Sequence, residues 1–184
     1  MDKSALLVMD MQTAILSMLP DTSNLLKNTT KAIEIAKANN IHVIYIVLGF
    51  RNDFQEVNPN NKAFANLKGR LANSKIEEFT QIHPELAPQK NDIIVIKRRV
   101  SAFTGSDLEV VLRSLGINHL LLAGVATGGV VLSTIREAAD KDYILTVLSD
   151  CCADSDDEIH QTLINKVFPR QASVINVEEW LEVK

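Results

Sequence analysis

The sequence predicts a three-layer α/β/α fold built on a six-stranded, parallel, doubly wound (Rossmann-like) sheet. Three observations lead to this class. Six short apolar runs recur along the chain, their apolar residues are near-continuous rather than alternating, and amphipathic helical patterns separate most of them. Near-continuous apolar runs are typical of strands that are covered on both faces. Alternation of strand and helix favours a parallel sheet with helices on both sides.

The expected strands are the apolar runs at 5–9, 41–47, 93–96, 119–123 and 144–148, with a less apolar run at 173–177. The expected helices are at 24–39, 106–115, 130–139 and 156–167. Ser106 and Glu109 have the spacing of a capping box, and Gly116 stands where a glycine commonly ends a helix. The last helix opens with acidic residues, which complement its N-terminal dipole.

One long segment, 48–91, interrupts this alternation and is rich in Asn, Pro and Gly. Only short helices, at 62–67 and 75–79, are expected within it. A long excursion from the carboxyl end of a strand is more often a lid or an oligomer contact than a linker. No second domain is indicated, so residues 1–184 are expected to form one domain.

Composition narrows the class of protein. Hydrophobic residues make up 46% of the chain and charged residues 23%, as in a soluble protein with a sizeable core. The net charge of −4 argues against a nucleic-acid partner. No apolar run is long enough to span a membrane, and no signal peptide is recognisable, so a cytoplasmic protein is expected. The adjacent Cys151 and Cys152 suit a reducing compartment, because vicinal cysteines rarely form a relaxed disulfide.

Reactive side chains are expected where the strands end. Asp10 follows the first strand, Lys97 follows the third, and the segment 124–129 closes the fourth. The carboxyl ends of parallel strands share one edge of the sheet, so these groups should converge there. A carboxylate beside an ammonium in an apolar cleft can act as a general acid and base. Each residue also has a simpler reading, since Asp10 could cap a helix and Lys97 could mark where a strand meets water.

The turn after the fourth strand has a sequence pattern typical of active-site turns but no reactive side chain at its centre. In AGVATGGVVLSTIREAAD, residues 123–140, a strand passes through two glycines into a helix, yet Gly128, Gly129 and Val130 offer no reactive side chain. Hydroxyl groups occur nearby, at Thr127, Ser133 and Thr134. No histidine lies in the motif to activate them, and helical hydroxyls usually bond to the backbone. A nucleophilic role for them is therefore not expected.

Four segments carry a family resemblance and occur in this order along the chain: VMDMQ, IKRRVSAFTGSDL, GVATGGVVLSTIREAAD and VLSDCCADSDDEIHQTLINKVFPRQA. Together they resemble the isochorismatase-like hydrolase family, also called the cysteine hydrolases. The resemblance implies the fold described above and a triad of Asp, Lys and Cys. Asp10 and Lys97 match the first two members, and Val130 stands at the cysteine position. Because valine is no nucleophile, the resemblance points to the chemistry of true isochorismatases, which lack the cysteine and protonate a vinyl ether with the Asp before water adds.

The resemblance also implies a cis peptide bond between Val125 and Ala126, which would aim amides at an oxyanion. The expected substrate and oxyanion contacts are therefore those of the turn, namely Val125, Ala126, Thr127, Gly128, Gly129 and Val130. Cys151 and Cys152 are expected to pack rather than to react.

Three further candidates each have an ordinary alternative. Gln12 could hold Asp10 or substrate, or make a structural hydrogen bond. Phe103 could wall the cleft, or be a core aromatic. Arg51 could bind a substrate carboxylate, or lie on the surface.

Cofactors and metals are not expected. The nicotinamidase branch of the family carries an Asp and two His after the second strand, whereas LGFRNDFQEVNPNNKAF has no histidine and one aspartate, Asp53. Isochorismate itself is also not expected, because Leu48 stands where isochorismatases have a substrate-binding glutamine. The sequence thus predicts a hydrolase of a small molecule, with carboxylated molecules favoured, and the family resemblance implies a homodimer or homotetramer. The alternative is a catalytically silent relative that binds a small molecule or serves in an assembly.

Overall fold

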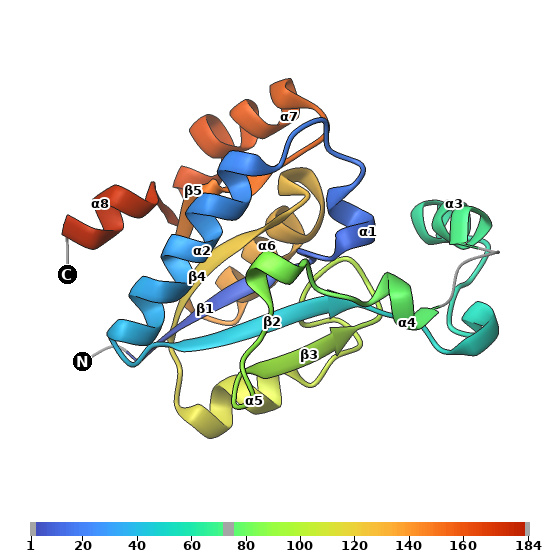
Figure 1. Cartoon of the computed structure of the whole chain (residues 1–184), viewed down its shortest axis with the longest axis horizontal. Helices are drawn as coiled ribbons and strands as arrows, with labels where there is room; N and C mark the ends of the chain where they lie inside the picture. Colours follow the sequence, from blue (N-terminus) through green and yellow to red (C-terminus); the bar gives the residue numbers. More distant parts are fainter. Residues whose placement is uncertain (1–2, 72–75, 183–184) are drawn as a thin grey trace.

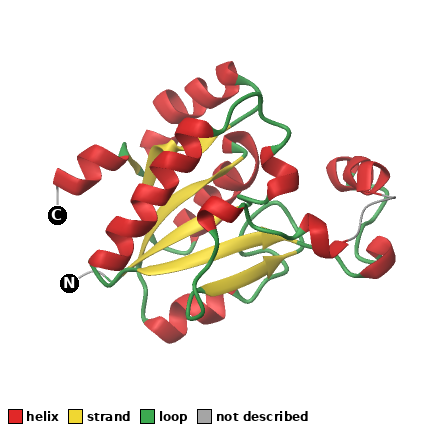
Figure 2. Ribbon diagram, in the orientation of Figure 1, coloured by secondary structure: helices red, strands yellow, loops and turns green. Residues whose placement is uncertain are grey.

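The computed structural model describes residues 3–71 and 76–182 and shows a six-stranded, all-parallel sheet between layers of helices (Figures 1 and 2). The strands lie in the order β3-β2-β1-β4-β5-β6. The chain therefore winds outward from β1 to β3 and then returns to β4 on the other side of β1. This reversal confirms the doubly wound topology and places the switch point between β1 and β4. The strands are β1 Ser4–Met9, β2 His42–Leu48, β3 Ile93–Lys97, β4 His119–Val125, β5 Ile144–Ala153 and β6 Ser173–Ile175.

Helices cover both faces of the sheet. The helices are α1 Thr13–Leu16, α2 Ser23–Ala38, α3 Lys62–Leu71, α4 Ile76–Phe79, α5 Leu108–Leu115, α6 Leu132–Asp140, α7 Asp157–Thr162 and α8 Val177–Glu182. In β1, Ala5, Leu7 and Met9 pack in a core with α5 and α6, whereas Leu6 and Val8 pack in a core with α2 and α8. Strands buried on both faces explain the near-continuous apolar runs. None of the described helices has the length and apolar character needed to cross a membrane.

All six predicted strands form; the bounds of β1 to β4 differ by at most two residues from those predicted, and β5 and β6 differ for structural reasons. β5 continues five residues past its predicted end, to Ala153, because its pairing with β4 shifts: Leu122 pairs with Val147, but Gly124 pairs with Cys152. This bulge brings both cysteines into the strand. β6 is shorter than predicted, because Val177 already begins α8.

The capping box predicted for α5 is wrong, although its end at Gly116 is confirmed by a left-handed φ of 66°. The helix begins at Leu108, whose amide donates to Ser106 Oγ. Glu109 does not reach back to the cap, because its carboxylate binds Arg113 and Lys141 instead.

Two other predicted helices are interrupted by π-helical turns. The helix expected at 130–139 is a π-helical turn, Thr127–Val131, followed by α6. The helix expected at 156–167 is α7 followed by a second such turn, Leu163–Val167. The short helices α1 and α8 are additions that the sequence patterns did not reveal.

Residues 48–71 and 76–79 of the excursion lie beyond the carboxyl ends of β2 and β3, where Figure 1 shows α3 and α4, and its last residues return to the amino end of β3. It has a small hydrophobic core of its own. The Phe50 ring centroid lies 5.4 Å from that of Phe54, 5.7 Å from that of Phe64 and 6.4 Å from that of Phe79. The helix predicted at 62–67 extends to Leu71, and Lys75 of the other predicted helix lies outside the described residues. The excursion thus forms a cap at the edge where the strands end.

Candidate active site

The ends of β1, β2, β3 and β4 meet at one edge of the sheet, as predicted. The Asp10 amide donates to the Ile46 carbonyl at 2.8 Å, and Met9 pairs with Gly124 in β4. A Cβ at Gly124 would lie 2.9 Å from the carbonyl oxygen of Met9. Only glycine permits so close an approach, so Gly124 fixes the position of β4 next to the peptide that carries Asp10.

Asp10 and Lys97 form a buried ion pair. Lys97 lies on β3, and its side chain crosses the end of β2 to bring Nζ within 2.9 Å of Asp10 Oδ2. The Lys97 side chain is 1% exposed and the Asp10 side chain 7% exposed. Nζ also donates to the carbonyl oxygens of Arg99 and Val100, each at 3.0 Å. The ammonium therefore uses all three of its donors, and the reading in which Lys97 marks where β3 meets water is wrong.

The Asp10 carboxyl is set up for proton transfer. Burial raises its pKa to about 6, the attraction of Lys97 opposing but not cancelling the effect. Oδ1 is buried, and among the described residues it has no hydrogen-bond partner. The residue itself has a left-handed φ of 55°, which aspartate tolerates better than most residues. Because the carboxyl turns to Lys97, the helix-cap reading is not supported, and Oδ1 is the oxygen that Lys97 does not engage.

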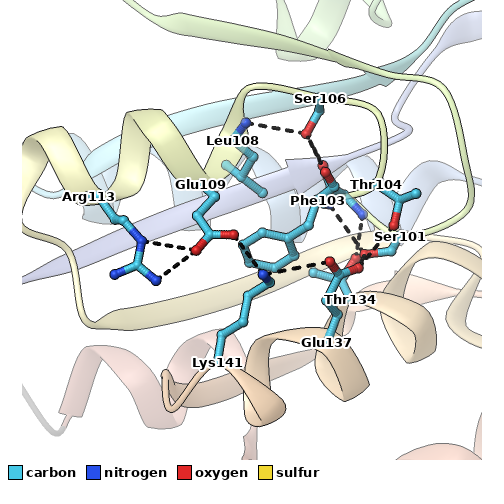
Figure 3. Close-up of polar contacts among 11 residues, drawn as sticks. Ser101, Phe103, Thr104, Ser106, Leu108, Glu109, Arg113, Thr134, Glu137 and Lys141 are labelled. Carbon is cyan, nitrogen blue, oxygen red and sulfur yellow. Dashed lines mark hydrogen bonds and ion pairs between the residues drawn. The ribbon is translucent and has the colours of Figure 1, made fainter.

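A polar network holds the carbonyl groups that bind Lys97. Figure 3 shows Ser101, which directly follows these carbonyls, and Thr104 converging on Glu137 of α6. Ser101 Oγ donates to Glu137 Oε2 at 2.6 Å, and Thr104 Oγ1 donates to the same oxygen at 3.1 Å. The Ala102 amide donates to Thr134 Oγ1 at 3.0 Å. The hydroxyl of Thr134 is thus a structural acceptor, and Glu137 joins α6 to the segment after β3, a contact that no sequence motif indicated.

The turn at 125–130 binds an anionic side chain through its backbone. The peptide bond between Val125 and Ala126 is cis, as the resemblance implied. The Gly128 amide donates to Asp154 Oδ2 at 2.7 Å. The Gly129 amide donates to the Ala126 carbonyl at 3.0 Å, so this amide serves the turn itself. The site predicted for an oxyanion therefore holds a carboxylate oxygen at Gly128, which is the chemistry expected of a helix-entry turn.

A histidine does reach this turn, contrary to the sequence prediction. Thr127 Oγ1 and His160 Nδ1 lie 2.8 Å apart, although the residues are 33 positions apart. Thr127 is fully buried, and His160 lies on α7, which packs over Gly128 through Ile159. Motif spacing could not reveal this contact, because it depends on how α7 folds back over β4.

The described site offers no thiolate. Val130 is buried in the core, so the position that matches the family cysteine carries no reactive group. Cys151 and Cys152 are buried on opposite faces of the sheet. Burial raises the pKa of the Cys152 thiol to about 12 and that of Cys151 well above its usual value. Both cysteines are protonated packing residues, as predicted.

Gln12 is structural, which was the alternative prediction for this residue. It is fully buried, and its Nε2 donates to the carbonyls of Leu48 at 3.0 Å and Phe79 at 2.6 Å. Its Oε1 accepts from the Leu48 amide at 2.7 Å. The side chain therefore joins β1, β2 and the cap, and both its donors are used.

Two other candidates are not part of the site. Phe103 was expected to wall the cleft, but its ring centroid lies 6.0 Å from that of Tyr143, which directly precedes the amino end of β5. Asp10 is at the opposite ends of the strands, so the prediction for Phe103 is wrong and the core reading holds. The Arg51 side chain is 65% exposed and binds Glu56 at 3.3 Å, as its surface reading predicted.

Among residues 3–71 and 76–182, no three His, Cys, Asp or Glu side chains gather in a way that could hold a metal ion. The chemistry that the site itself can supply is proton transfer at Asp10, charge stabilisation by Lys97 and anion binding by the turn.

Comparisons with known proteins agree with this fold. The isochorismatase domain model matches residues 4–179. The uncharacterised isochorismatase family protein YwoC of Bacillus subtilis is 29% identical, covering 98% of this chain and 93% of that protein. The ureidoacrylate amidohydrolase of Serratia proteamaculans is 32% identical, covering 96% of this chain and 76% of that protein. A solved isochorismatase family protein from Burkholderia thailandensis is 26% identical and superposes with a TM-score of 0.82, covering 96% of this chain and 93% of that one. This chain therefore belongs to the isochorismatase family of hydrolases.

Proposed function

We propose that this protein hydrolyses a small, carboxylated molecule by proton transfer at Asp10, with water rather than a protein side chain as the nucleophile. The observation that carries the proposal is the buried Asp10–Lys97 pair, in which Oδ2 is bound to Nζ and Oδ1 is left without a partner among the described residues. An enzyme needs such a free oxygen, whereas a binding module has little use for a buried acid held by a lysine.

The proton can move in either direction, and the substrate decides which. With a vinyl ether, protonated Asp10 gives its proton to the enol carbon, water adds to the resulting cation, and a proton returns to the carboxylate. The hemiketal so formed then breaks its C–O bond and releases a carbonyl compound and an alcohol. With an amide, ionised Asp10 takes a proton from water, the water adds to the carbonyl carbon, and Asp10 passes the proton to the leaving nitrogen. In both schemes Lys97 stabilises the carboxylate form without losing its own proton.

A carboxylate on the substrate is supported by the turn. The Gly128 amide already binds the carboxylate oxygen of Asp154 at 2.7 Å, so a substrate carboxylate that displaces Asp154 would meet a donor suited to it. The relative from Serratia proteamaculans is named for ureidoacrylate, a molecule with both an amide-type bond and a carboxylate. Ureidoacrylate and its simple analogues are therefore the first substrates to try.

The second candidate function is a silent small-molecule binder. Val130 favours it, because the chain has a buried valine at the position where the family resemblance places a nucleophile. A binder would retain the anion-binding turn but would have no need for a proton at Asp10.

Turnover of a panel of ureido acids, carboxylated amides and vinyl ethers separates these functions. Wild type is compared with Asp10→Asn, because asparagine tolerates the left-handed backbone of Asp10 and keeps an acceptor for Lys97. We expect ligand-induced thermal stabilisation of both proteins but turnover by wild type alone, with a loss of about 100-fold or more in the variant. Equal stabilisation of both proteins with no turnover by either would identify a binder.

A further inference from the structure

The backbone that holds Lys97 has few hydrogen bonds of its own. Nζ of Lys97 donates to the carbonyl oxygens of Arg99 and Val100 at 3.0 Å each, and these are two of its three contacts. Both carbonyls lie beyond the end of β3, and within the described chain no backbone-to-backbone hydrogen bond involves residues 98–101. Sheet pairing therefore does not fix the two acceptors, and side chains have to do so.

The side chain of Arg99 fixes this segment to the cap. Its Nη2 donates to the carbonyl oxygen of Glu56 at 3.0 Å, and its Nη1 donates to that of Arg98 at 2.7 Å. The guanidinium carbon lies 5.9 Å from the ring centroid of Phe64, on α3. The planar fork of an arginine suits two acceptors at once, because its N–H groups have fixed directions. Arg99 thus joins the segment after β3 to two places in the cap.

The backbone of Arg99 also contacts the ion pair. Its carbonyl binds Nζ of Lys97, and Nζ lies 2.9 Å from Asp10 Oδ2. Glu137 holds the far end of the same segment through Ser101, on the side of α6. The segment is therefore held by α6 at one end and by the cap at the other, and the acceptors for Lys97 lie between them.

The neighbouring Arg98 makes a different set of contacts. Its Nε lies 3.5 Å from Glu56 Oε1, a carboxylate oxygen that Arg51 also binds. The Arg98 carbonyl accepts from Arg99 rather than from Nζ of Lys97. Arg98 therefore carries the same charge next to the same cap without holding an acceptor of Lys97.

We propose that Arg99 is a positioning residue for the Asp10–Lys97 pair, because it anchors to the cap the backbone that binds Lys97 Nζ. Its meaning for catalysis rests on the proposed function, in which this pair transfers the proton. The attraction between two charges falls with their separation, so the position of Nζ decides how strongly it acts on Asp10.

The pKa of Asp10 reports on this position. Lys97 is the charged group of the described chain that opposes the effect of burial on this pKa. If Nζ is held less firmly, the pKa of Asp10 should therefore rise further above its usual value. A purely structural role for Arg99 predicts otherwise. Loss of its contacts would then lower the melting temperature and leave the Asp10 carboxyl unchanged.

An NMR titration of the Asp10 carboxyl carbon tests the proposal without any turnover. The signal is assigned by its loss in Asp10→Asn. Arg99→Lys keeps the positive charge and loses the fork, and the matched control Arg98→Lys makes the same change one residue away. We expect the midpoint, which is the pKa of about 6 in wild type, to rise by about half a pH unit or more in Arg99→Lys and to stay in place in Arg98→Lys.

A second variant covers the case in which Arg99→Lys does not fold. Phe64→Leu removes the ring that lies against the guanidinium and keeps an apolar side chain at this buried position. It should raise the midpoint by a smaller amount, because Arg99 keeps its two hydrogen bonds.

Two results would overturn the proposal. One is a midpoint that is unchanged or lower in folded Arg99→Lys, or in Phe64→Leu where the lysine variant does not fold; a lower midpoint would mean that water reaches Asp10 instead. The other is an equal rise in Arg98→Lys, which would make the effect a general one of the segment. Because the titration needs no substrate, a lack of turnover by wild type would count against the proposed function and leave this test intact.

Discussion

Thr127 Oγ1 and His160 Nδ1 lie 2.8 Å apart and join the turn after β4 to α7. The two ends of this hydrogen bond differ in their surroundings, since Thr127 is fully buried and His160 is half-buried. Loss of the histidine leaves a buried hydroxyl without its partner, whereas loss of the hydroxyl leaves a ring that water can reach. The two substitutions should therefore have unequal effects on stability.

We expect His160→Ala to lower the free energy of unfolding by about 1–3 kcal/mol and Thr127→Val to lower it by less than about 1 kcal/mol. The double variant should be no less stable than His160→Ala, because the stranded hydroxyl is gone. Urea denaturation of wild type, the two single variants and the double variant gives the free energies of a double-mutant cycle. A larger effect from Thr127→Val than from His160→Ala would contradict the assignment.

The buried acid should make stability depend on pH. Asp10 has a pKa raised from 3.8 to about 6, so the folded state binds its proton more tightly than the unfolded state does. Ionisation then disfavours folding, and this contribution to the free energy of unfolding should fall as the pH rises from about 4 to about 6, by about 3 kcal/mol in total. The difference in unfolding free energy between wild type and Asp10→Asn, measured by urea denaturation at several pH values, isolates this group. A difference that stays constant from pH 4 to pH 7 would refute the raised pKa.

The pH profile of kcat/KM should show in which direction the first proton moves. If Asp10 acts first as an acid, as with a vinyl ether, activity should fall tenfold per pH unit above about 6, the pKa of its carboxyl. If it acts first as a base, as with an amide, activity should fall by the same factor below that pH. A profile with neither limb near pH 6 would remove Asp10 from the proton transfer.

Glu137 should influence activity through the segment that holds Lys97. We expect Glu137→Ala to lower kcat by about tenfold, because Ser101 and Thr104 lose their common acceptor and the carbonyls bound to Nζ become less fixed. Glu109→Ala is the matched control, since Glu109 also binds Lys141 but makes no hydrogen bond to Ser101 or Thr104. Steady-state kinetics should show a loss of kcat in the first variant alone, and equal losses in both would point to a general effect on folding.

Sequence patterns predicted the sheet and the acid–lysine pair for the same reason. Strands buried on both faces are apolar throughout, and the carboxyl ends of parallel strands share an edge, so Asp10 and Lys97 could be brought together before any coordinates were known. Contacts that depend on how loops and helices fold back could not be predicted. His160 contacts Thr127 because α7 packs over the turn after β4. Glu109 binds Lys141, at the end of α6, instead of capping α5. Phe103 lies beside Tyr143, near the amino end of β5.

Gln12 joins the two ends of the cap by hydrogen bonds. Its one amide group binds the backbone of Leu48, where the excursion leaves the sheet, and the carbonyl of Phe79, toward its return. The chain between these two points is thus a closed loop whose length is independent of the strand that carries Asp10. Residues inserted into the loop, or lost from it, would reshape the cap while Asp10 kept its place. In evolutionary terms, this arrangement lets the cap change in length and sequence without moving the strand end that carries Asp10.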